Sequence, residues 1–253
     1  AARADKQFIG SAELYEGINK VIMGPQRKSH VITESDKRIT AYHESGHAIL
    51  AHLCEKCDPV QEVTIIPRGP AAGYTLMRPE TDDNHVSKAK LLDNICMGLG
   101  GRVAEEIVIK DICTGASGDI EQATETAKRM VTEWGMSEKL GLMAYGSDSQ
   151  TVFLGKDMET HSAYSEETAR LIDEEMRKII NDAHARATKL LTENRSILDN
   201  MARVLIERET IYTEEVEMLM KGKTYSEVIE YMDKQDSKHV ENTFKKYSST
   251  DEN

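Results

Sequence analysis

Apolar side chains recur every three or four positions through most of the chain. This spacing places them on one face of an α-helix, so it predicts a chain built mainly of amphipathic helices. Capping residues and glycines mark where helices begin and end. The predicted helices cover residues 11–23, 33–54, 87–107, 120–134 and a long stretch after 165, with shorter ones opening at Ser196 and Thr213.

One short stretch departs from the helical pattern. Residues 60–66 are rich in β-branched side chains and end at Pro67, which predicts a strand. A partner strand is expected to start at Gly73. Because the first strand is short and a proline follows it, an edge position in a small sheet is favoured.

The helix predicted over 33–54 contains His43-Glu44-Ser45-Gly46-His47, an H-E-x-x-H pentapeptide. On an α-helix His43 and His47 project from one face, about 40° apart, so they can bind one metal ion. Glu44 lies roughly 60° from His47 on the other side, where its carboxylate can take a proton from water. The pattern indicates a hydrolytic zinc site.

The surroundings of the pentapeptide support a helix. Thr33-Glu34-Ser35-Asp36 has the form of a capping box at the helix start. An apolar stripe that would bury the helix is formed by Ile39, Tyr42, Ile49 and Leu53. The alternative is a surface helix that carries two histidines by chance.

A hydrolytic zinc site takes three protein ligands and keeps a fourth position for water, so a third ligand is needed. The carboxylate candidates are Glu105, Glu106 and Asp119. The two glutamates continue an amphipathic helix, whereas Asp119 follows two glycines in a turn that opens a helix and places a short side chain rigidly. An ordinary helix cap is the alternative role for Asp119. The residues alone favour Asp119 only slightly and leave both glutamates open.

The composition of the chain argues against nucleic acid and against a membrane span. The chain has 253 residues, of which 39% are hydrophobic and 30% charged, as in a globular soluble protein. Its formal net charge of -12 argues against nucleic acid as a partner, because phosphate binding needs clustered Lys and Arg. No run of about 18 apolar residues and no signal-peptide form is found, so no membrane span is predicted.

The cysteines are too few and too scattered for a disulfide framework, which indicates a reducing compartment. They are Cys54, Cys57, Cys96 and Cys113. The Cys54-Glu55-Lys56-Cys57 segment is a C-x-x-C that could be redox-active or half of a second metal site. No second C-x-x-C accompanies it, so a structural role is favoured.

The last part of the chain, residues 221–253, is polar. We expect a short helix at most there, followed by disorder. Gly222-Lys223-Thr224 resembles the end of a phosphate-binding loop, but Glu217 stands where the first glycine should be. No nucleotide site is predicted.

Several blocks in fixed order carry a resemblance that is more specific than the pentapeptide. They resemble the peptidase domain of the FtsH family of membrane-anchored, ATP-dependent zinc metalloproteases, over residues 35 to 219. The blocks are Ala41 to Ala48, Val63-Thr64-Ile65-Ile66-Pro67-Arg68-Gly69, Leu99 to Glu106, Thr114-Gly115-Ala116-Ser117-Gly118-Asp119 and Trp134-Gly135-Met136-Ser137.

The resemblance implies that Asp119 is the third zinc ligand, with one zinc per chain. Gly118 stands where the family more often has Asn, a change that should loosen the turn without removing the ligand. The implied fold is a mainly α, helical zinc-metallopeptidase domain with a small β element. The implied activity is hydrolysis of unfolded or membrane-extracted proteins, with Glu44 as the catalytic base.

The resemblance also implies parts outside this chain. Family members carry transmembrane segments and an AAA+ ATPase module before the peptidase domain, and Ala1-Ala2-Arg3-Ala4 resembles the close of that module. We therefore expect a C-terminal fragment, with residues 1–32 as the end of the ATPase lid and a linker, 33–220 as the peptidase domain and 221–253 as the tail. ATP and Mg²⁺ are expected only through the missing module, and the membrane only through the missing segments. The location implied is the reducing side of a membrane, in the cytoplasm or an organelle interior.

Further expectations concern the surfaces of the domain. An open strand edge that faces substrate is expected at Val63, Thr64, Ile65 and Ile66. A homohexamer is expected, with apolar surface offered by Met201, Val204, Leu205 and Met218. Candidates for stabilising the oxyanion are His52, His85, His161, His184 and several tyrosines, for each of which a solvated or packed position is the favoured alternative.

Two alternative functions belong to classes of protein other than enzymes. One is a noncatalytic, zinc-stabilised scaffold, and the other is an interaction module built from the C-terminal helices. Glu44 argues against a scaffold, because a structural zinc site is usually closed by a fourth Cys or His and needs no intervening glutamate.

Overall fold

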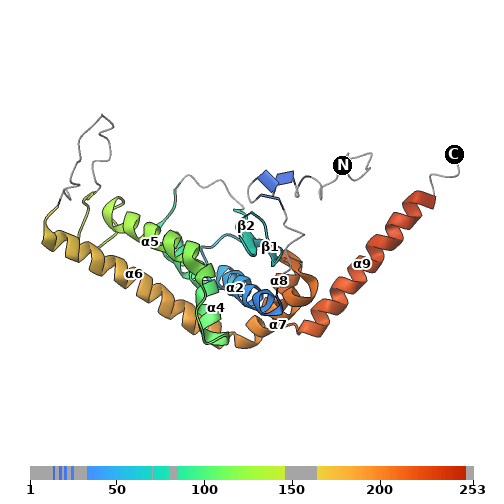
Figure 1. The fold of residues 1–253 in the computed structure, drawn as a ribbon. Coiled ribbons are helices and arrows are strands. Elements are labelled where there is room, and N and C mark those ends of the chain that lie inside the picture. Colours follow the sequence, from blue (N-terminus) through green and yellow to red (C-terminus); the bar gives the residue numbers. More distant parts are fainter. Residues whose placement is uncertain are drawn as a thin grey trace. The chain divides into compact units, whose positions relative to one another are not determined.

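The computed structural model describes residues 33–69, 71–79, 85–145 and 164–248, with isolated positions between 14 and 25. Within them the fold is mainly α with one small sheet, which confirms the predicted class. The predicted helix at 11–23 lies largely outside the described residues. In chain order the elements are α2 (Glu34–Leu53), β1 (Val60–Thr64), β2 (Tyr74–Met77), α3 (Lys88–Gly98), α4 (Gly100–Val108), the 3-10 turn η2 (Thr114–Ala116), α5 (Ser117–Thr132), α6 (Glu166–Glu193), α7 (Arg195–Arg208), β3 (Thr210–Tyr212), α8 (Thr213–Met220) and α9 (Tyr225–Ser248) (Figure 1).

Helix α2 begins where its sequence predicts. The Thr33 hydroxyl accepts a hydrogen bond from the backbone N–H of Asp36 (3.1 Å) and donates one to the Asp36 carboxylate (2.8 Å). From residue 41 to 51 every residue except His43 is buried, so α2 is a core helix and not one with a single apolar stripe. A helix held on nearly all sides gives its side chains little freedom to move.

The described chain forms two compact units. The first contains α2 up to Ser45, the sheet, and helices α7, α8 and α9. The second contains α2 from Gly46 onward and helices α3 to α6.

The sheet of the first unit has the strand order β2-β1-β3, and both pairings are antiparallel. Val63 pairs with Thr75 on one side and with Ile211 on the other. The prediction of an open edge at residues 63 to 66 is therefore wrong, because β1 is the central strand. The prediction failed because of β3, a strand of only three residues that follows α7 in the chain and pairs with β1. A strand this short has no recognisable sequence pattern.

The two residues that follow β1 are also engaged. The Ile65 N–H donates to the carbonyl of Glu209 (2.9 Å), and the Ile66 N–H donates to the Thr64 hydroxyl (3.1 Å). The free edges of this sheet, among the described strands, belong to β2 and β3.

Helix α7 is the core of the first unit and packs against β3, α8 and α9. Met201, Val204 and Leu205 are completely buried, and Met218 is half-buried. The prediction that these residues offer surface for assembly is wrong. Their apolar faces are used within one chain.

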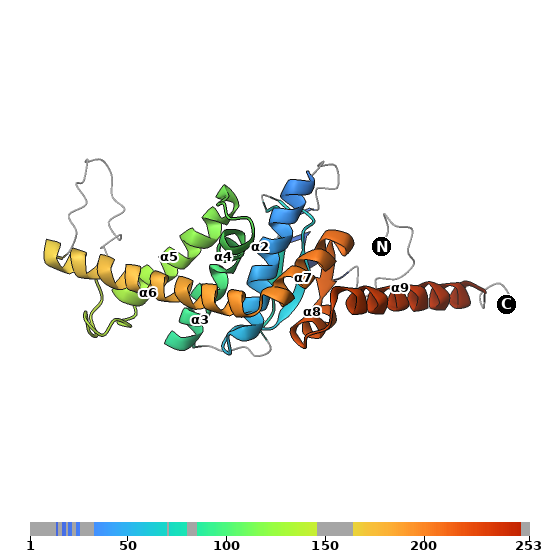
Figure 2. The same cartoon turned by 90° about the horizontal axis from the view of Figure 1, so that it is seen from below.

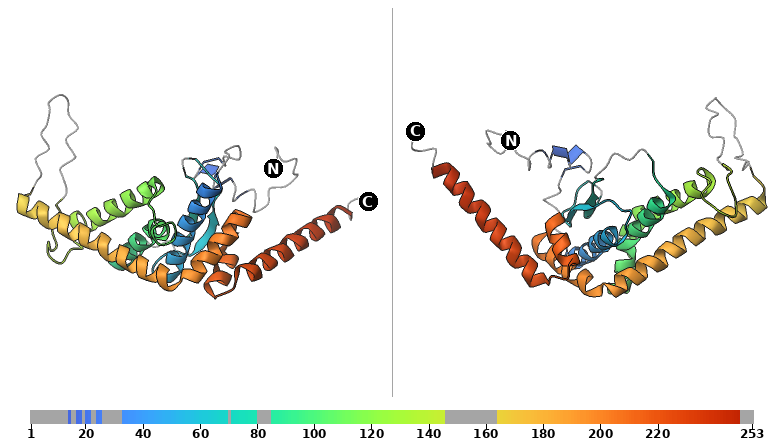
Figure 3. Two further views of the ribbon diagram at one scale, coloured as in Figure 1. Left: turned by 60° about the horizontal axis from the view of Figure 1, so that its bottom comes forward. Right: turned by 180° about the vertical axis from the view of Figure 1, so that it is seen from behind.

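Helix α9 is longer than the sequence predicts. It runs without a break for 24 residues, as Figure 3 shows, whereas a short helix at most was expected. Val228 is completely buried and fixes its first turns. Farther along, ion pairs at i, i+4 spacing, such as Glu230 with Lys234, support a helix that has few apolar residues.

In the second unit α6 runs beside α3, α4 and α5 and packs against each of them (Figure 2). The single helix predicted over 87–107 is two helices, α3 and α4, separated at Leu99. Ser87 caps α3, since its hydroxyl accepts a hydrogen bond from the Lys90 N–H (3.2 Å). None of the described helices combines the length and apolarity that a bilayer crossing needs.

Glycine permits a close approach at the start of α4. A Cβ built on Gly100 would lie 2.7 Å from the carbonyl oxygen of Gly46 and 3.0 Å from the amide nitrogen of His47. Glycine at this position therefore allows the backbone of α2 to pack closely against α4. At Gly98 a Cβ would meet nothing within 4 Å, so that residue has no such role.

Candidate metal centre

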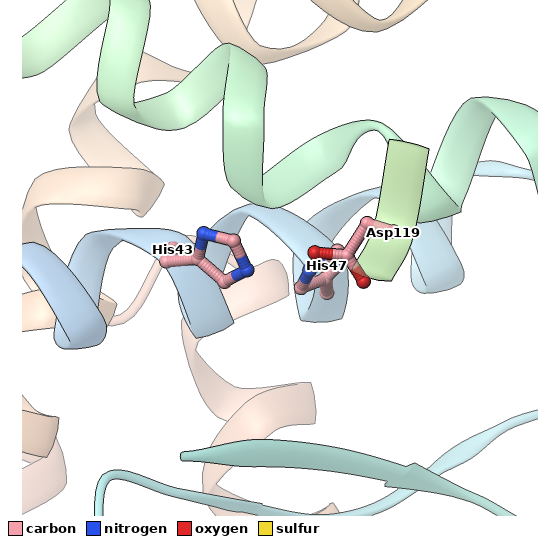
Figure 4. A group of neighbouring side chains, drawn as sticks. All are labelled: His43, His47 and Asp119. Atoms are coloured by element: carbon pink, nitrogen blue, oxygen red, sulfur yellow. Dashed lines mark ion pairs between the residues drawn. The ribbon is translucent and has the colours of Figure 1, made fainter. Parts of the chain in front are cut away.

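Two helices bring His43, His47 and Asp119 together. The histidines lie one turn apart on α2, and Asp119 lies in the first turn of α5, directly after η2. Each residue offers one ligand atom, and these three atoms all lie within 4.8 Å of one another. Figure 4 shows His43 and His47 on one helix, with Asp119 next to His47. Within the described residues this is the only such trio of His, Cys, Asp or Glu.

The ring of His47 is held in one tautomer. Its Nδ1 lies 2.9 Å from the carbonyl oxygen of Met97, which can only accept a hydrogen bond, so Nδ1 carries the proton. The lone pair of Nε2 is then directed at the trio. A metal-binding histidine normally has such an outer partner, which fixes the ring and makes the free nitrogen a better ligand.

The spacing between His47 and Asp119 fits a shared ion. Nε2 of His47 lies 3.7 Å from Oδ2 of Asp119, which is too long for a hydrogen bond. Ligands about 2.1 Å from a tetrahedral zinc ion lie roughly 3.4 Å from one another. Two nitrogens and one carboxylate oxygen are also the donor types that zinc prefers, so the residues fit this metal.

Glu44 is buried next to the trio and is held by the sheet. Glu44 is only 6% exposed, and its Oε2 accepts a hydrogen bond from the Thr75 hydroxyl (3.0 Å). The Thr75 hydroxyl also lies 3.2 Å from the Glu44 carbonyl oxygen. A Cβ at Gly73 would stand 2.6 Å from the backbone oxygen of Thr64 and 3.0 Å from Oε1 of Glu44, so glycine lets the chain before β2 pass this closely. Nothing in the sequence pattern singles out Thr75.

The two rival carboxylates have other partners. Glu105 is 1% exposed and accepts a hydrogen bond from the Cys113 N–H (3.1 Å). Glu106 accepts from Arg102 (2.7 Å) and pairs with His184 (2.9 Å). Although burial opposes ionisation, these two partners hold the pKa of Glu106 below its ordinary value. The structure thus places Asp119, and neither glutamate, with the histidines.

The histidines considered for the oxyanion lie elsewhere in the described chain. His184 is engaged with Glu106, and His52 and His85 are exposed. His161 lies outside the described residues. None of the three described ones belongs to the metal-ligand trio.

The family model of peptidase family M41 matches residues 30–219, which is most of the chain. The chain belongs to peptidase family M41. This confirms the resemblance to FtsH peptidase domains, and the M41 match covers every residue of the trio together with Glu44.

Similar proteins with the same name come from several bacteria. The chain is 48% identical over 227 residues to the ATP-dependent zinc metalloprotease FtsH of Veillonella parvula, which covers 90% of the chain and 35% of that protein. It is 50% identical over 222 residues to ATP-dependent zinc metalloprotease FtsH 1 of a Thermoanaerobacter species, covering 88% of the chain and 36% of that protein. For FtsH 3 of Symbiobacterium thermophilum the identity is 49% over 221 residues, or 87% of the chain and 35% of that protein. The M41 chain therefore spans about a third of the length of these relatives.

Proposed function

We propose that this M41 domain is a zinc endopeptidase in which His43, His47 and Asp119 hold one zinc ion and Glu44 is the general base. One observation carries the proposal. Three ligand atoms lie within 4.8 Å of one another, and the neighbouring carboxylate is buried and fixed by a hydroxyl. The relatives' names, which specify zinc, support the choice of metal.

In the proposed hydrolysis, each residue of the site has a separate role. When bound, zinc polarises both a water molecule and the scissile carbonyl. Glu44 accepts the proton that the water loses as it attacks the peptide carbon, and then passes this proton to the leaving amine. Thr75 keeps the carboxylate oriented, and the Met97 carbonyl keeps His47 in the tautomer that binds metal. A noncatalytic scaffold has no use for a carboxylate placed in this way.

The substrate is proposed to lie at the free edge of β2. Among the described strands β2 pairs with β1 alone, and its Thr75 contacts Glu44. An extended polypeptide that adds to a sheet edge is recognised mainly through its backbone, so many unfolded sequences can bind. Unfolded protein segments are accordingly the substrate class that we propose.

The whole protein is proposed to act as an ATP-dependent assembly. The relatives are named ATP-dependent, which supports binding of ATP and Mg²⁺ outside residues 33–220. A homohexamer, anchored to a membrane with this domain on the reducing side, is part of the same proposal. It rests on the FtsH resemblance, since the apolar residues of α7 are core.

A Glu44→Gln variant tests the assignment of the base. Glutamine keeps the shape of the side chain and removes its basicity, so casein cleavage should fall by about 10²–10⁴-fold while zinc stays bound. Glu34→Gln, at an exposed position on the same helix, is the matched control and should leave both unchanged. Cleavage by Glu44→Gln within a few-fold of wild type, with full zinc content, would remove Glu44 from this role.

A further inference from the structure

Cys54 and Cys57 enclose a tight turn at the end of α2. The Cys54 N–H still donates to Leu50, as in the helix (2.9 Å), and the Cys57 N–H donates to the Cys54 carbonyl (3.0 Å). A turn closed by such a bond holds its end Cα atoms within about 7 Å. Disulfides span Cα distances of about 4.4–6.8 Å, so this turn brings two thiols to a distance at which they can join.

A third thiol meets the first. Cys96, on α3, is completely buried, and it lies near enough to Cys54 to affect the pKa of that thiol, as Cys57 does. All three cysteines are free. The C-x-x-C is therefore not isolated as its sequence suggests, because the packing of α3 adds a sulfur that lies far from it along the chain.

The surroundings favour a thiolate at Cys54. The neighbouring thiols of Cys57 and Cys96 lower the pKa of Cys54, although burial opposes this. Arg186 of α6 adds a positive charge, which an ion pair with Asp93 (2.5 Å) partly offsets. The same Asp93 carboxylate accepts from the Lys56 N–H (2.9 Å), which ties the turn to α3.

The thiols differ in how far solvent reaches them. Cys54 is 2% exposed, whereas Cys57 is only partly buried, with its sulfur 3.6 Å from the Asn94 side-chain oxygen. A reagent from solvent therefore meets Cys57 first, and Cys54 lies behind it as the resolving thiol. In the described chain the three cysteines are not among the groups placed closely enough to hold a metal ion.

We propose that Cys54 and Cys57 are a redox-active dithiol that a small disulfide such as glutathione disulfide converts to an intramolecular disulfide. The Cys57 thiol gives its proton to water and its sulfur attacks one glutathione sulfur, so that a glutathione thiolate leaves. The Cys54 thiolate then attacks the Cys57 sulfur, the mixed disulfide breaks and the second glutathione leaves as a thiolate. The first glutathione thiolate takes a proton from water, so the dithiol is oxidised by two electrons and the glutathione disulfide is reduced by two.

The test equilibrates the purified chain in glutathione buffers of increasing oxidised fraction, followed by acid quenching, alkylation and peptide mass mapping. Of the four cysteines, two should lose alkylation together, with a disulfide mapped between Cys54 and Cys57. Cys57→Ser should abolish this step, and Cys113→Ser, the matched control, should leave it unchanged. In Cys96→Ala the disulfide should still form, but alkylation of the remaining pair should require a higher pH, because Cys96 helps to lower the pKa of Cys54.

Two results would overturn the proposal. One is that no intramolecular disulfide forms in wild-type chain at glutathione ratios that modify Cys113. The other is that a disulfide forms between Cys54 and Cys96, which would show that the C-x-x-C turn takes no part as a dithiol pair.

Discussion

The hydroxyl of Thr75 on β2 stands 3.0 Å from Oε2 of Glu44 and 3.2 Å from the carbonyl oxygen of the same residue. One hydroxyl thus contacts both the side chain and the backbone of the proposed base. A freely rotating glutamate next to a metal could swing toward it and become a ligand. The contact with Thr75 restrains the carboxylate beside the metal site.

Removal of this hydroxyl should slow catalysis without loss of zinc. A hydrogen bond to a charged group contributes about 1.5–3 kcal/mol, so Thr75→Val should lower kcat by roughly 10- to 100-fold. Thr75→Ser, which keeps the hydroxyl, should retain most of the activity. Steady-state cleavage of a fluorogenic peptide and zinc analysis of the same preparations measure both effects. An unchanged kcat in Thr75→Val would show that Glu44 needs no such support.

Asp119→Ala should lose zinc. The loss of an outer partner alone weakens metal binding by about 10- to 100-fold, so the loss of a ligand should weaken it by more than about 100-fold. Glu106→Gln, which alters a carboxylate outside the trio, should retain zinc. Metal analysis after dialysis separates the two variants, and full zinc in Asp119→Ala would disprove the ligand set.

Chelation should abolish proteolysis reversibly. Zinc ligands must be deprotonated to bind, so a strong chelator should act faster as the pH is lowered, when protons compete for His43 and His47. One equivalent of zinc per chain, added back at neutral pH, should restore casein cleavage. Activity that survives with no zinc left in the sample would refute a metal mechanism.

Gly100→Ala should destabilise the second unit. Its methyl group would stand 2.7 Å from a backbone oxygen that has no rotamer to change, and overpacking of this kind costs about 1–3 kcal/mol. Gly98→Ala is the control, because its methyl group meets nothing within 4 Å and alanine favours a helix over glycine by about 1 kcal/mol. Urea unfolding should move the midpoint down for the first variant and not for the second. Equal midpoints would mean that the backbones can separate without cost.

The features that the sequence predicted correctly are those marked by residues close together in the chain. Helix α2 has its cap, its helical spacing and its paired histidines within 20 residues, so each can be recognised from neighbouring residues alone. Asp119 is different, because its approach to α2 depends on how α5 packs. The residues alone left Glu105 and Glu106 open, and only the resemblance to a family decided among them.

Two kinds of interaction account for the errors, long-range packing and local charge pairing. β3 has three residues, too few for a pattern, and its pairing with β1 is fixed by the packing of α7 and α8 around it. Thr75 reached Glu44, and Cys96 reached Cys54, by the same kind of long-range packing. Charge pairing along α9 replaced the apolar pattern by which a helix is normally recognised.

The contact between Gly46 and Gly100 changes how the pentapeptide should be read. The two middle positions of H-E-x-x-H are written as if any residue could stand there. In this chain the second of them has room only for hydrogen, because the backbone at the start of α4 occupies the space of a side chain. A search pattern for domains of this architecture therefore gains selectivity if it requires glycine at that position and a second glycine at the start of the later helix. A chain that has both histidines and the glutamate but a larger residue there must hold the start of the later helix farther from the metal-binding helix.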